Sequence, residues 1–121
     1  MLLVQGLGAD VRLEHLTITG GRTTGDYEGG AGIRADQYTS LTLDHSTVRG
    51  NSSAGEYAAG GGISGSVVML NDCLVTQNSA VGRGAHGGGI SGGYGSVTLN
   101  NSTVSDNSVH GRYARGGAIA L

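Results

Sequence analysis

Apolar and polar residues alternate in short runs that recur along the chain. The clearest runs read V-x-L or L-x-L, at 11–13, 41–43, 68–70 and 97–99. A period of two is typical of β-strands that bury one face. After a polar step each run leads to a second short stretch, as in Cys73 and Val75, and a glycine-rich segment ending in isoleucine supplies a third. No apolar stripe with a helical period reaches ten residues. The pattern therefore predicts an all-β fold with three short strands per repeat.

The glycine-rich segment occurs four times and sets the period. It reads G-A-G-I at 30–33, G-G-G-I at 60–63 and 87–90, and G-G-A-I at 116–119. The isoleucines are therefore 30, 27 and 29 residues apart. Twelve residues before each isoleucine lies a second column, which is asparagine in three of the four repeats. The two columns are Ile33, Ile63, Ile90 and Ile119, and Asn51, Asn78 and Asn107.

Self-similarity at a period near 28 residues is typical of solenoids, in which each repeat forms one coil. We predict a single domain over residues 1–121, a right-handed parallel β-helix of about four coils of 27–30 residues stacked about 4.8 Å apart. The handedness follows from the chirality of parallel crossovers. The expected coils are residues 6–29, 30–59, 60–86, 87–115 and a partial coil at 116–121. The chain is either a complete domain or a fragment of a longer solenoid.

Composition fits a thin, stacked coil. The chain has 25 glycines and no proline, tryptophan or phenylalanine. Glycine permits sharp corners and close packing of neighbouring backbones, whereas proline would remove a hydrogen-bond donor from an interior coil. We expect the asparagine column to form a ladder at a bend, with side-chain amides bonded along the stack and the asparagines tolerating left-handed geometry.

The pairing of G-G-[AG]-I with V-x-x-N, at 48–51, 75–78 and 104–107, resembles a known pattern. It is similar to the G-G-A-[ILV] and F-x-x-N repeats of polymorphic outer-membrane proteins and of bacterial β-helix adhesins, within the pectate-lyase-like superfold. The family's Phe is Val or Ile here. The resemblance implies a right-handed β-helix within a longer passenger that is extracellular or at the cell surface and presents loops for adhesion. Residues 1–4 lack the basic flank and length of a secretory signal, so a cytoplasmic protein also stays open.

An enzyme is the principal alternative to a structural or adhesive module, because many proteins of this superfold are polysaccharide lyases or hydrolases. Such enzymes use clustered acids to bind calcium, or paired carboxylates as acid and base. The nearest candidates are Glu14 and Asp44, one coil apart, with His15 and His45 beside them. The chain has no Asp-Asp pair and no lysine. We therefore interpret this column as an exposed polar bend and expect no catalytic residues.

The segment between the asparagine and isoleucine columns gives the candidate binding site. Its aligned positions stack Tyr27, Tyr57, Gly84 and Tyr113, and beside them Asp26, Glu56, Arg83 and Arg112. His86 and Arg115 follow in the same segment. A tyrosine row is a platform for a sugar or a protein partner, with Glu56 and Arg83 able to pair. In the alternative interpretation the tyrosines only cover a thin core and the charges are solvated.

Further function classes change the picture little. A net charge of −2 without a basic cluster argues against nucleic acid as a partner. The chain contains no run of eighteen apolar residues that could span a membrane. Interrupted T-x-T rows at 17–19 and 103–105 leave an ice-binding solenoid as a minor alternative. Cys73 is expected to be a buried thiol, and no cofactor or metal is expected. Uncapped ends or an apolar face predict a homo-oligomer.

Overall fold

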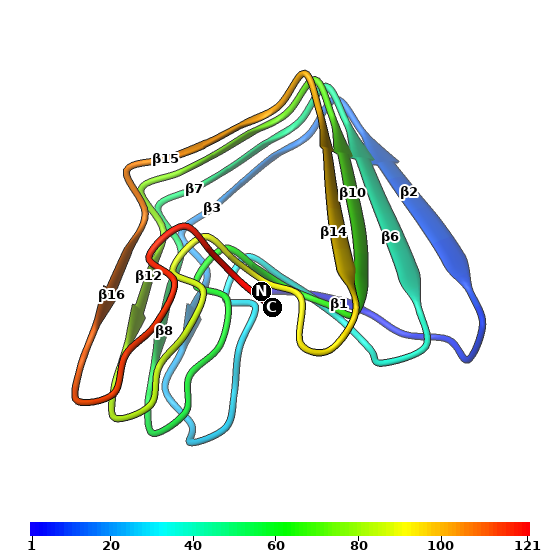
Figure 1. Ribbon diagram of the computed structural model, residues 1–121. Helices are drawn as coiled ribbons and strands as arrows, with labels where there is room; N and C mark the ends of the chain where they lie inside the picture. Colours follow the sequence, from blue (N-terminus) through cyan, green and yellow to red (C-terminus); the bar gives the residue numbers. More distant parts are fainter.

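The computed structural model describes residues 1–121, and the chain forms a parallel β-solenoid of about four turns that contains no helix. Each coil lies directly on the preceding one, and corresponding strands form continuous sheets along the stack (Figure 1). No helix that could cross a membrane is present. All strand pairs are parallel and in register, so the predicted all-β solenoid is confirmed.

Four sheets run the length of the stack. Sheet A consists of β1 (Leu2–Val4), β5 (Ile33–Ala35), β9 (Ile63–Ser64), β13 (Ile90–Ser91) and β17 (Ile119–Ala120). Sheet B consists of β2 (Asp10–Glu14), β6 (Ser40–Asp44), β10 (Val67–Asn71) and β14 (Ser96–Asn100). Sheet C consists of β3 (Thr17–Thr19), β7 (Thr47–Arg49), β11 (Leu74–Thr76) and β15 (Thr103–Ser105). Sheet D consists of β4 (Arg22–Thr23), β8 (Ser52–Ala54), β12 (Ser79–Val81) and β16 (Ser108–His110).

Sheet D is the one difference from the predicted coil, which had three strands rather than four. Its strands lie in the segment that follows the asparagine column. The sequence pattern predicts a loop for this segment. The inward positions of this sheet are mostly small, namely Thr23, Ser53, Ala80 and Val109. Because these residues carry little apolar area, the alternation that reveals a half-buried strand is weak here.

The core is built from the aliphatic columns of sheets A, B and C. Ile33, Ile63 and Ile90 are fully buried and aligned by register. Leu43 and Leu70 on sheet B and Val48 and Val75 on sheet C face them and are also buried. Alternation places the residue between each apolar pair on the outside, so each strand contributes one face to the core.

A narrow side lobe projects from this core. We define it as sheet D with the turns that follow, residues 22–30, 52–60, 79–87 and 108–116. In Figure 1 its strands and turns lie at the lower left, away from the strands of sheet B at the right. Its interior holds a separate small cluster, Ala58, Ala80 and Ala85, with Val109 packed against it. Side chains of this size let the two walls of the lobe approach closely.

Each coil turns its corners through residues with positive φ. Where the chain enters sheet A, the first glycine of the repeated segment has φ between 63° and 65° in all four coils: Gly30, Gly60, Gly87 and Gly116. Glycine adopts this conformation without steric cost. The third residue has a different role, because a Cβ on Gly62 would lie 2.7 Å from the carbonyl oxygen of Gly89 in the next coil. The repeated segment thus combines a corner with a close approach of two backbones.

The predicted asparagine ladder is present where sheet C meets sheet D. Asn51 donates from its backbone N (3.1 Å) and Nδ2 (2.9 Å) to Oδ1 of Asn78, which in turn donates from the same two atoms to Oδ1 of Asn107. Asn78 Nδ2 also donates to the Val48 carbonyl, 2.9 Å away. The expectation that the asparagines adopt left-handed geometry is wrong. The residue before each asparagine does so instead, namely Gly50, Gln77 and Asp106.

We expect Asn78→Ala to lower the free energy of unfolding by about 3 kcal/mol, since it leaves the backbone N–H of Asn51 without a partner in a buried site and removes the side-chain hydrogen bond to the Val48 carbonyl. Urea unfolding followed by far-UV circular dichroism measures this. The matched control is Asn100→Ala, whose exposed amide donates only to Asn71, and which should cost less than about 0.5 kcal/mol. Equal losses from the two substitutions would contradict the ladder's structural role.

Candidate functional site

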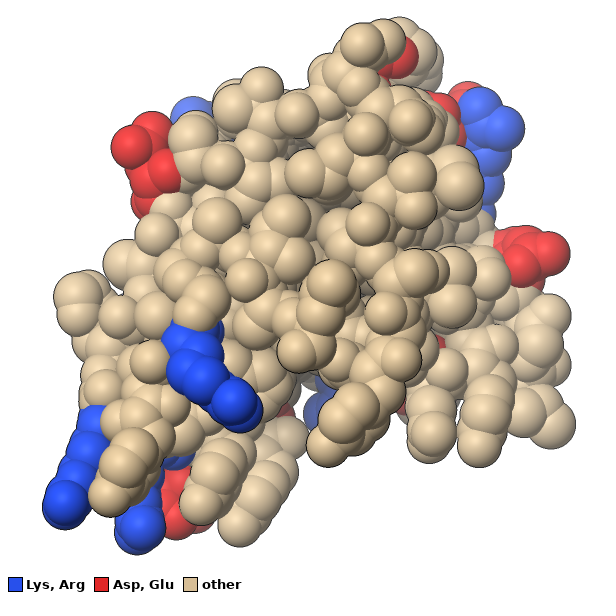
Figure 2. Space-filling model, viewed as in Figure 1, with Lys and Arg blue, Asp and Glu red and all other residues tan.

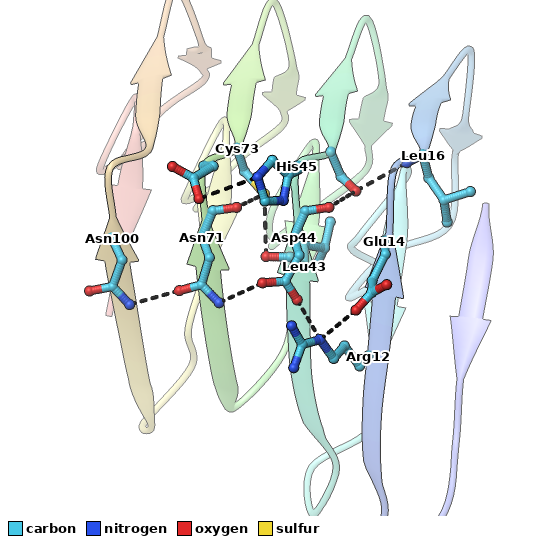
Figure 3. Close-up of polar contacts among 11 residues, drawn as sticks. Arg12, Glu14, Leu16, Leu43, Asp44, His45, Asn71, Cys73 and Asn100 are labelled. Atoms are coloured by element: carbon cyan, nitrogen blue, oxygen red, sulfur yellow. Dashed lines mark hydrogen bonds and ion pairs between the residues drawn. The ribbon is translucent and has the colours of Figure 1, made fainter.

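The acidic column contains an ion-pair cluster rather than a free carboxylate pair. Strand pairing aligns Glu14 on β2 with Asp44 on β6, and Arg12 lies between them (Figure 3). Its Nε is 2.8 Å from Glu14 Oε1 and 2.8 Å from Asp44 Oδ2. Arg12 and Glu14 are exposed, whereas Asp44 is buried. One guanidinium therefore neutralises the repulsion that two stacked carboxylates would otherwise have.

A ladder of amides continues this cluster across sheet B. Asn71 Nδ2 donates to Asp44 Oδ1 at 2.9 Å, and Asn100 Nδ2 donates to Asn71 Oδ1 at 2.8 Å (Figure 3). Asp44 Oδ1 thus has an amide partner. Asp44 Oδ2 makes no hydrogen bond and has Arg12 as its only partner. Both oxygens of Asp44 are engaged within the sheet, which is the arrangement of a structural ion pair.

The two histidines lie at the corner between sheets B and C. His15 and His45 have φ of 54° and 47°, and their rings stack with centroids 5.1 Å apart. His45 Nε2 is 3.6 Å from Asp72 Oδ2 in the next coil. The structure therefore brings Glu14, Asp44 and the two histidines to one region of the surface, as their columns predict. No group of three or more His, Cys, Asp or Glu side chains is arranged to hold a metal ion.

Cys73 lies in the inward column with Ser46 and Ser102, as expected. Its Sγ donates to the carbonyl oxygens of Leu43 (3.3 Å) and Asn71 (3.1 Å), and the residue is 5% exposed. Burial raises the pKa of this thiol above its ordinary value of 9.0, because the thiolate would lose its hydration. This raised pKa makes Cys73 a poor nucleophile at neutral pH.

The outer face of sheet C carries the rows considered for ice binding. Register places Leu74 between Thr47 and Thr103, and Arg49 between Thr19 and Thr76. Both rows of small hydroxyl side chains are therefore interrupted by a larger residue, so the face lacks a regular array.

The tyrosine column occupies the turn of the side lobe. Tyr27, Tyr57 and Tyr113 have φ between 56° and 63°, a left-handed conformation that bulky residues seldom adopt. Their exposed fractions are 72%, 41% and 65%. Tyr27 and Tyr57 stack with ring centroids 5.1 Å apart and planes inclined by 12°. The small cluster that contains Ala58 and Ala85 forms the interior of the same lobe.

A slot opens where glycine interrupts this column. Gly84 has the same left-handed backbone, φ 71°, and a Cβ at this position would lie 2.6 Å from Tyr57 Cδ1. The ring of Tyr57 therefore leans over the missing side chain. The resulting cavity has a volume of about 470 Å³. Its lining residues are Tyr57, Gly84, His86, Tyr113, Ala114 and Arg115.

Positive charge gathers at one side of the slot. The guanidinium carbons of Arg112 and Arg83 lie 5.2 Å and 6.0 Å from the centroid of the Tyr113 ring. Figure 2 shows arginine side chains projecting at the lower left, where Figure 1 places the turns of the side lobe. The predicted pairing of Glu56 with Arg83 does not form, since the ion pairs of the structure involve only Arg12 and His45.

Most of the residues that line the slot are predicted from the sequence, but the slot itself is not. Gly84 falls in the tyrosine column, whereas no sequence pattern indicates Ala114. The glycine at this position of the tyrosine column could have predicted the slot, because a small residue between large ones in a stacked column leaves room for about one side chain. A second hollow of about 390 Å³ near Arg34 and Tyr38 was also not foreseen.

The raised pKa of Cys73 predicts a pH-dependent contribution to stability. The folded state favours the neutral thiol, so its contribution is present below about pH 9 and is lost as the pH rises through the folded-state pKa. The matched control is Cys73→Ser, because Ser46 and Ser102 occupy the same column. We expect the free energy of unfolding of the wild type to fall relative to Cys73→Ser above pH 9. A difference that stays constant from neutral to strongly alkaline pH would show that the thiol ionises as readily in the folded state.

Comparison of the chain with protein-family models, with curated proteins and with solved structures gives no match. The solenoid and its sites are therefore interpreted from their own geometry.

Proposed function

We propose that this chain is a non-catalytic structural module of adhesin type, which binds a carbohydrate through the tyrosine column and the slot beside Gly84. The observation that carries the proposal is the row of exposed tyrosines held in left-handed turns, two of which, Tyr57 and Tyr113, line a cavity of about 470 Å³. The motif resemblance to surface-displayed β-helix passengers supports the same function and a location outside the cell.

Backbone strain at the tyrosines argues for a role beyond packing. A left-handed conformation costs a non-glycine residue about 1 kcal/mol, and Gly84 shows that this turn forms with glycine. Three coils nevertheless carry tyrosine there. Strain of this kind is often associated with functional sites, where exposed aromatic rings are needed in a fixed position.

The chemistry of the slot suits a sugar. A pyranose ring has a face of C–H groups that packs on an aromatic ring, and its hydroxyl groups bond with polar tips such as the tyrosine hydroxyl. The slot is lined by the rings of Tyr57 and Tyr113 and by His86, whose Nδ1 lies 3.1 Å from the Gly84 carbonyl oxygen. The rings supply contact area and the imidazole supplies a polar group.

The acidic column gives less support to the enzyme alternative. A lyase or hydrolase would need a carboxylate free to bind a cation or to transfer a proton. Asp44 is instead bonded to Asn71 on one oxygen and faces Arg12 with the other. These contacts favour a structural role.

We expect Tyr57→Gly and Tyr113→Gly each to weaken glycan binding about tenfold, which corresponds to about 1.4 kcal/mol. Both variants should fold, because Gly84 occupies the same turn. A glycan array identifies ligands, and calorimetry measures the affinities. The control is Tyr38→Ala, an exposed tyrosine outside the column. Absence of any bound glycan, or cleavage of polyuronate by the wild type, would overturn the proposal.

We also propose that copies associate through an outer coil or an apolar face, because the outer coils leave strand edges unpaired within the chain and sheet B exposes Val67 and Met69. Sedimentation velocity should show a dimer or larger species. Met69→Lys should abolish association through the apolar face and leave end-to-end association intact. A monodisperse monomer at high concentration would contradict both modes.

A further inference from the structure

We infer that the slot selects an anionic sugar, carrying a carboxylate or a sulfate group, and that Arg112 and Arg115 bind the anion. This inference rests on the proposed carbohydrate-binding function and names the class of ligand. It begins from the cavity where Gly84 interrupts the tyrosine column.

The cavity lies between two rings of the tyrosine column. Tyr57 of the second coil and Tyr113 of the fourth coil both line it. The ring of Tyr57 covers the space directly above Gly84, because a Cβ there would lie 2.6 Å from Tyr57 Cδ1. A sugar ring would therefore enter the cavity beside Gly84 and pack against Tyr57 and Tyr113.

Unpaired cations lie at one side of this cavity. Arg115 contributes to the lining of the slot, and Arg112 and Arg83 lie over Tyr113 at its rim. None of these three arginines has a carboxylate within ion-pairing distance. Contact with the Tyr113 ring holds the Arg112 guanidinium near the slot while leaving its N–H edges free. A planar guanidinium with free edges matches a carboxylate or sulfate group through two parallel hydrogen bonds.

The acidic residues of the edge lie at its other end. The backbone N–H of Glu56 donates to Asp26 Oδ1 at 2.8 Å. Asp26 and Glu56 belong to the first and second coils, whereas Arg112 and Arg115 belong to the fourth. The charge order along the edge fixes the orientation of an anionic ring, with its acidic group directed toward the fourth coil.

Dextran, dextran sulfate and carboxymethyl dextran give a direct test, because they share one backbone and differ in charge. We expect the wild type to bind at least one anionic polymer about a hundredfold more tightly than dextran at physiological salt. Arg112→Gln and Arg115→Gln should each lower that affinity about tenfold and leave binding of dextran unchanged. The control is Arg49→Gln, an exposed arginine on sheet C. Tyr57→Gly should weaken binding of the anionic polymer as well, since the ring and not only the charge is recognised.

Each outcome separates the inference from the function on which it rests. Preference for carboxymethyl dextran or for dextran sulfate identifies the acidic group, and both results support the inference. Equal affinities for dextran and its charged derivatives would overturn the inference and leave carbohydrate binding intact. An equal loss in Arg49→Gln, or unchanged affinity in Tyr57→Gly, would show non-specific attraction and also overturn it. Failure of all three polymers and of every glycan on the array would overturn the proposed function itself.

Discussion

Parallel hydrogen bonding between coils, strand on strand and in register, fixes almost everything else in this molecule. Because each coil repeats the one before it about 4.8 Å away, every position of the sequence becomes a column. Each side chain must therefore pack or bond favourably with the same type of side chain at the equivalent position of the adjacent coils. Isoleucine, leucine and valine meet this requirement by packing, and asparagine meets it because an amide both donates and accepts. A carboxylate does not, and at Glu14 and Asp44 the chain supplies Arg12 between the two.

The same constraint explains how much could be predicted from the sequence. The columns of Ile33 and Asn78 lie in register because a fixed period leaves the repeats no other alignment, and the structure confirms them. Sheet D was not predicted, because its buried residues Ser53 and Ala80 carry little apolar surface. Its strands therefore lack the alternation of apolar and polar residues that indicates a half-buried strand. Left-handed geometry was assigned to the asparagines, but it falls one residue earlier, at Gln77 and Asp106, because the asparagine side chain must point inward to its ladder.

The candidate binding site was predictable only in part. Sequence alignment placed Tyr57, Gly84 and Tyr113 in one column, but the direction of the rings depends on backbone torsions that a sequence pattern does not specify. The left-handed turn directs the tyrosines outward, and the leaning ring of Tyr57 sets the shape of the slot. Likewise, Glu56 and Arg83 are neighbours by column but form no ion pair. Exposed long side chains gain too little from such a pair for column position alone to ensure it.

The asparagine ladder has a direction. Each backbone N–H in the column donates forward, from Gly21 to Asn51, from Asn51 to Asn78 and from Asn78 to Asn107, and every acceptor is the side-chain oxygen of the following coil. In this backbone-to-side-chain series the two sides of a coil are therefore chemically unlike, because one side offers the backbone N–H and the other offers Oδ1 of the asparagine. An interior coil can be duplicated or removed whole, since the new neighbours still meet donor to acceptor. A coil inverted in the stack would set like groups against each other, so a solenoid of this kind varies in length by whole repeats that all keep one polarity.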